Sequence, residues 1–114
     1  MDSILNTIKD SLGLAEEYEY FDNQLIGYIN TSLSILNQLG VGPEEGFVVH
    51  DKNDTWFDFV SDINKLEMIK SYIQLKVKLL FDAPLGSASI DSINRQINEL
   101  EWRINVAVDP KRTT

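Results

Sequence analysis

Residues 63–81 read INKLEMIKSYIQLKVKLLF, which is the strongest helical pattern in the sequence. Apolar side chains follow two neighbouring stripes at helical spacing and cover most of the helix surface, which is typical of a central helix. We therefore expect a helix from Ile63 or Asn64 to Phe81, with Asn64 and Glu67 spaced as a capping box. The stripes contain Leu66, Ile69, Ile73, Val77 and Leu80, and Met68, Tyr72, Leu75 and Leu79.

Residues 82–86, Asp-Ala-Pro-Leu-Gly, end this helix, because proline disfavours helical backbone at the residue before it. Apolar residues then recur at helical spacing from Ile90 to Ile104 and predict a further helix from Ser87 or Ser89 to Val106. This seam is too short for an independent coiled coil, so the helix should pack on residues 63–81 as an antiparallel hairpin. Trp102 falls away from the seam and, with Arg103, is a candidate subunit-contact residue.

Two shorter helical patterns precede the central one. Residues 2–12 place apolar side chains on one face, and Gly13 follows as a natural stop. Asp22 is the expected N-cap of a second helix that runs to about Leu39. Residues 14–21 form an acidic and aromatic connection between these two helices.

Residues 40–62 contain three glycines and one proline in the first seven positions and show no sustained helical period, which predicts a long loop. Within this loop, residues 47–50 could form a short extended piece, and Thr55 could cap a single helical turn. That turn carries three aromatic residues, and exposing such a cluster is uncommon in a monomer. Either the loop is pinned to the core or another subunit completes it, so the candidate subunit-contact residues here are Trp56, Phe57 and Phe59.

The composition fits one small globular domain. The chain has 114 residues, of which 43% are hydrophobic and 25% charged, enough for one compact core. The predicted fold class is all-α: a small bundle of about four helices, with a long central loop between the second and third and a hairpin of the third and fourth. We expect residues 1–108 to form this single domain and residues 109–114 to be a flexible tail without an apolar anchor.

Charge is distributed unevenly along the chain. Residues 1–62 contain twelve acidic and two basic residues, a net charge of -10, whereas residues 63–114 contain six acidic and eight basic residues, a net charge of +2. An acidic protein is a poor general binder of nucleic acid, because affinity for phosphate comes chiefly from Lys and Arg. The two halves could attract each other between neighbouring copies; ordinary solvated surface charge is the simpler interpretation.

No residue pattern typical of catalysis or cofactor binding is present. His50 is the single histidine, and the chain has no cysteine, so neither a catalytic triad nor a zinc site is indicated. Residues 51–62 loosely match a calcium loop, but Trp56 occupies the position where the sharp turn needs glycine. We therefore expect no enzyme activity and no cofactor or metal. No apolar stretch reaches membrane-spanning length and the first residues lack a secretion signal, which favours the cytoplasm or an assembled particle.

Several stretches together resemble the small head-tail connector, or adaptor, proteins of tailed bacteriophages that infect Gram-positive bacteria. They span most of the chain and are residues 35–43, 56–59, 72–85 and 93–105. The resemblance implies a helical protein that joins a ring of about twelve copies beneath the portal. Such a ring would contact the portal protein on one side and a tail-side connector or stopper protein on the other, while DNA passes through its lumen. The resemblance also implies a place in the virion, at the head-tail interface, after assembly in the host cytoplasm.

A second interpretation from another class is a small acidic regulatory module, of the DNA-mimic or anti-repressor type. Such a module would act as a monomer or dimer. Ring formation distinguishes the two interpretations.

Overall fold

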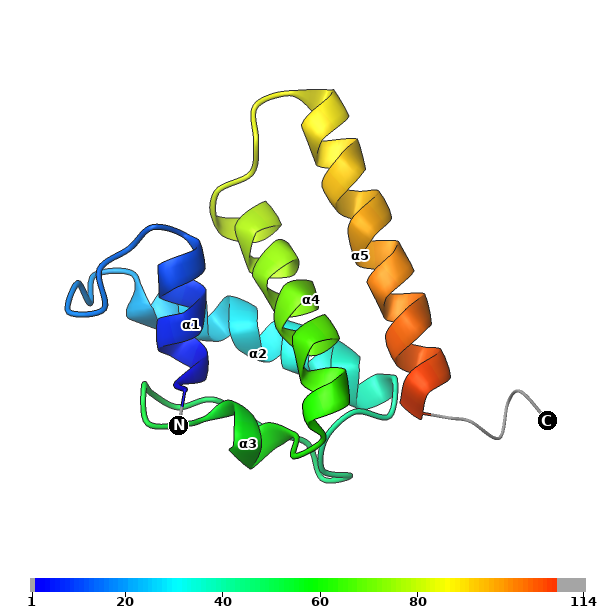
Figure 1. The fold of residues 1–114 in the computed structure, drawn as a ribbon. Helices are drawn as coiled ribbons and strands as arrows, with labels where there is room; N and C mark the ends of the chain where they lie inside the picture. Colours follow the sequence, from blue (N-terminus) through cyan, green and yellow to red (C-terminus); the bar gives the residue numbers. More distant parts are fainter. Residues whose placement is uncertain (1, 109–114) are drawn as a thin grey trace.

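The computed structural model describes residues 2–108, which fold into five helices (Figure 1). The all-α prediction is confirmed: four of the helices are those expected, and the fifth is the single turn expected after Thr55. Among the described residues no strand forms, and the isolated β-bridge joins Ser3 to Thr55. The helices are α1 (Ile4–Ser11), α2 (Asp22–Gln38), α3 (Trp56–Phe59), α4 (Ile63–Phe81) and α5 (Ser87–Val108).

The predicted flexible tail, residues 109–114, lies outside the described residues. Residues 1–108 as a single domain stay a prediction, although the buried apolar side chains form one cluster with members from all five helices.

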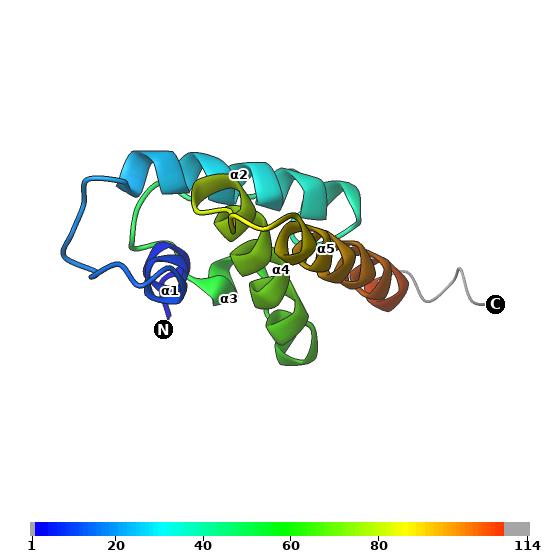
Figure 2. The same cartoon turned by 90° about the horizontal axis from the view of Figure 1, so that it is seen from above.

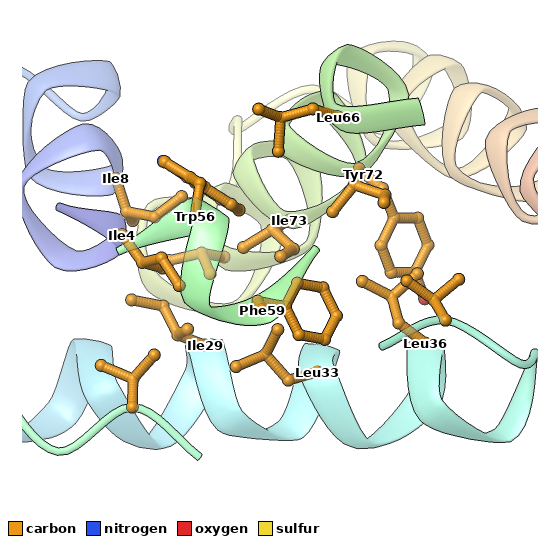
Figure 3. Close-up of a cluster of buried hydrophobic side chains, with 14 of the residues drawn as sticks. Ile4, Ile8, Ile29, Leu33, Leu36, Trp56, Phe59, Leu66, Tyr72 and Ile73 are labelled. Carbon is orange, nitrogen blue, oxygen red and sulfur yellow. The ribbon is translucent and has the colours of Figure 1, made fainter. Parts of the chain in front are cut away.

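Helix α4 is central, as its two apolar stripes predict. It packs against α1, α2 and α5, and Figure 3 shows its Leu66, Tyr72 and Ile73 among side chains from the other helices. The first stripe is buried as far as Val77, whereas Leu80, in the last turn, is 50% exposed. In the second stripe Tyr72 is fully buried, and the half-buried members are Met68, Leu75 and Leu79.

Helix α5 folds back along α4 as the expected antiparallel hairpin (Figures 1 and 2). Its seam points to α4: Ile93, Ile97 and Ile104 are buried, and Leu100 is half-buried. The hydroxyl of Tyr72 donates a hydrogen bond of 2.7 Å to Glu101 Oε2. Burial and this carboxylate together raise the pKa of Tyr72 far above its usual range, so the phenol keeps its proton.

Two of the predicted helix caps are wrong. Phe21 occupies the N-cap position of α2, and the carboxylate of Asp22 pairs instead with Lys9, at 2.8 Å between Nζ and Oδ1. Helix α4 starts two residues earlier than a cap at Asn64 would allow, because the carboxylate of Asp62 accepts the Asn64 amide hydrogen at 2.9 Å. At α2 no side chain caps the helix, and at α4 the cap is a local bond from the residue just before the helix.

The long loop between α2 and α4 is fixed to the core at several points. The side-chain amide of Asn30 bonds both backbone groups of Val49, at 2.8 Å and 3.0 Å, and residues 47–50 form no strand. The Asn37 amide donates to the Pro43 carbonyl at 2.9 Å. Gly42 adopts φ +83° directly under the Phe59 ring, where a Cβ would lie 2.5 Å from Cε1.

Candidate functional site

Trp56 and Phe59 belong to the core of the subunit. They are 1% and 4% exposed and point from α3 into the space among α1, α2 and α4 (Figure 3). The indole Nε1 of Trp56 donates to Thr7 Oγ1 at 3.0 Å, and the ring of Phe59 lies 5.4 Å from that of Phe47. Trp56 and Phe59 are therefore pinned to the core, which is the first of the two expectations for the aromatic cluster. They leave almost no exposed area that another subunit could cover.

The other three candidates lie at the surface. Phe57, also on α3, is 41% exposed, and Trp102 is 68% exposed. Arg103 forms an ion pair with Glu99 one turn away, at 2.8 Å, and both side chains are exposed. Contact with another subunit stays a prediction for Phe57, Trp102 and Arg103.

A further exposed feature is the segment of residues 14–21, named here the acidic-aromatic loop. Tyr18 and Tyr20 are 47% and 78% exposed, and their ring centroids are 6.3 Å apart. Phe21 contacts both tyrosines and also Phe81 of α4, at 5.0 Å between ring centroids. The loop therefore presents two aromatic rings on a base that is fixed to the core. The clustering of tyrosines and glutamates is visible in the sequence, but their exposure and their support by Phe81 are not.

The charges of this loop have no basic partner at the surface. Glu16, Glu17 and Glu19 are exposed, and none of them forms an ion pair with any of residues 2–108. The charge of the neighbouring Asp10 is the largest cause of a raised pKa at Glu16, followed by partial desolvation, a hydrogen bond with Asp10 and the charge of Glu17, while Lys9 acts in the opposite sense. Negative charge is thus crowded here, which favours a cationic partner.

Helix α5 presents an exposed face on the side opposite its buried seam, named here the outer face of α5. It includes Arg95, Trp102 and Val106, spaced by seven and four positions, and also the exposed acids Asp91 and Glu99, each four positions from Arg95. Trp102 and Val106 are 68% and 36% exposed. Arg95 is exposed and pairs with no carboxylate in the described part of the chain. The outer face of α5 therefore combines apolar area with charges of both signs.

A shallow groove follows the contact between α4 and α5. Its lining includes the half-buried Met68, Leu75 and Leu100, with Gln96 and Arg103 beside them. The lining also includes Ser71 and Glu99, and the carboxylate of Glu99 pairs with Arg103. Apolar, amide and ion-paired groups of this kind suit a contact surface.

The single histidine, His50, lies in the loop between α2 and α4. His50 is 79% exposed and lies 3.8 Å from Asp54, while Asp54 accepts backbone hydrogens from His50 and Asp51 and so holds a turn. Within residues 2–108 no three His, Cys, Asp or Glu side chains are grouped so that they could hold a metal ion. Over the same residues no helix is long and apolar enough to cross a membrane.

Comparison with known proteins gives one match. A sequence-family model described as "Phage connector protein" matches residues 4–111, which include all five helices. No curated protein and no solved structure matches the chain.

Proposed function

The chain belongs to the phage connector protein family, and we propose on this basis that it forms a ring beneath the portal and joins the DNA-filled head to the tail. The family is a structural one of the phage particle, so the role is assembly and not catalysis. The observation that carries the proposal is the match of the family model over residues 4–111, nearly the whole chain.

The proposed partners follow from this position. On the head side the ring contacts the portal protein, and on the tail side it contacts a further connector or a stopper protein. The third partner is the chain itself, in about twelve copies related by rotation. The protein is then assembled in the host cytoplasm and remains at the head-tail interface of the virion.

The surface of the subunit supports such a role. Exposed aromatic residues are enriched at the centres of protein interfaces, and here Tyr20, Phe57 and Trp102 occur on three different elements. A ring subunit needs several separate contact surfaces, one for each neighbour and one for the portal. A single catalytic cleft is not required.

The DNA passage is the second part of the proposal. A lumen lined by acidic side chains would let DNA slide without adhering, because phosphate affinity depends on basic residues. Replacing exposed acids of the 40–62 loop, such as Glu44 and Glu45, by lysine should then slow DNA ejection from assembled particles. Unchanged ejection would show that these two acids do not line the passage.

The mass of the protein in solution tests the role directly. We would measure it by light scattering, first alone and then after mixing with the portal protein encoded in the same genome. A ring or a portal-bound complex is the expected result, and the misfolded Ile73→Asp variant described below serves as the control. A chain that remains a monomer or dimer and ignores the portal at every salt and protein concentration would instead support the regulatory module.

A further inference from the structure

We draw no further inference here: the strongest candidate, the exposed surface of the acidic-aromatic loop between α1 and α2, is a cluster of acidic and tyrosine side chains, and nothing in the described part of the chain shows what covers it.

Discussion

At the scale of single residues, Lys9 connects three parts of the chain. Its side chain is 1% exposed, and its ammonium contacts Asp22 Oδ1 at 2.8 Å and donates to the Glu16 carbonyl at 2.8 Å. The residue therefore ties α1 to the start of α2 and fixes the first part of the acidic-aromatic loop. Without Lys9 the carboxylate of Asp22 would lose its counter-charge, and a buried carboxylate without a counter-charge costs free energy of folding.

Replacing Lys9 by methionine should lower the free energy of unfolding by about 2–3 kcal/mol. The cost lies at the lower end for a buried pair because Asp22 is 21% exposed and regains some hydration. Urea unfolding followed by circular dichroism measures the change. The matched control is Lys65→Met, which breaks an exposed pair with Asp62 at 3.7 Å and should cost less than about 1 kcal/mol. Equal losses in the two variants would contradict the assigned role of Lys9.

Glu16 should make stability depend on pH in the opposite sense to a typical salt-bridged acid. Asp10 raises the pKa of Glu16, so ionised Glu16 opposes folding above that pKa, and the penalty disappears as pH falls and the carboxyl takes up a proton. Glu16→Gln should thus raise Tm at neutral pH and have no effect in acid where Glu16 is already protonated. Thermal unfolding across pH checks this, with Glu45→Gln as a control that removes the same charge elsewhere. A lower Tm for Glu16→Gln at neutral pH would refute the argument.

At the scale of elements, α4 shows that two positions with the same apolar pattern in the sequence can differ in burial, and therefore in the cost of a polar substitution. Ile73 and Leu75 lie on its two apolar stripes, and from the sequence alone both are expected to face the core. In the structure Ile73 is completely buried, while Leu75 is half-buried and lines the groove between α4 and α5. Only the first position is closed to water.

Ile73→Asp should therefore leave the chain unfolded at room temperature, because an uncompensated carboxylate in the core costs more than a small domain can supply. Leu75→Asp should fold with reduced stability, since its carboxylate can turn toward the solvent of the groove. The helical circular dichroism signal and its thermal transition distinguish the two variants. A cooperative transition in Ile73→Asp, or none in Leu75→Asp, would contradict this reading of the core.

At the scale of the whole molecule, the division of charge along the chain does not separate two ends. Among residues 63–108 the excess of lysine lies on the central helix α4, whereas α5 carries three acids (Asp91, Glu99 and Glu101) against Arg95 and Arg103. The chain as a whole has a formal net charge of -8, so neighbouring copies repel one another over long range.

Association of copies with one another should consequently strengthen as salt increases from about 0.1 M to about 1 M, where the Debye length falls from about 10 Å to about 3 Å. Sedimentation velocity measures the assembled fraction at each salt concentration. Association that weakens with salt would show that local ion pairs between copies outweigh the net repulsion.

Much of the fold follows from local patterns in this sequence. Period and stop signals are properties of neighbouring residues, so the four longer helices, the hairpin of α4 and α5, and the turn capped by Thr55 were predictable. The same holds for the exposure of Trp102, which falls opposite a regular seam. The resemblance to connector proteins depends on the sequence as well, because a family is recognised by residues in order.

Tertiary structure alone decided the features that depend on residues distant along the chain. Trp56 and Phe59 are covered by α1, α2 and α4, and nothing in their own segment separates them from the exposed Phe57. The carboxylate of Asp22 pairs with Lys9 and does not cap α2. Tyr18 and Tyr20 form an exposed aromatic surface because the neighbouring Phe21 packs against Phe81. Local sequence determines helices because their hydrogen bonds close within four residues, whereas burial and surface are set by packing between elements, which no local pattern encodes.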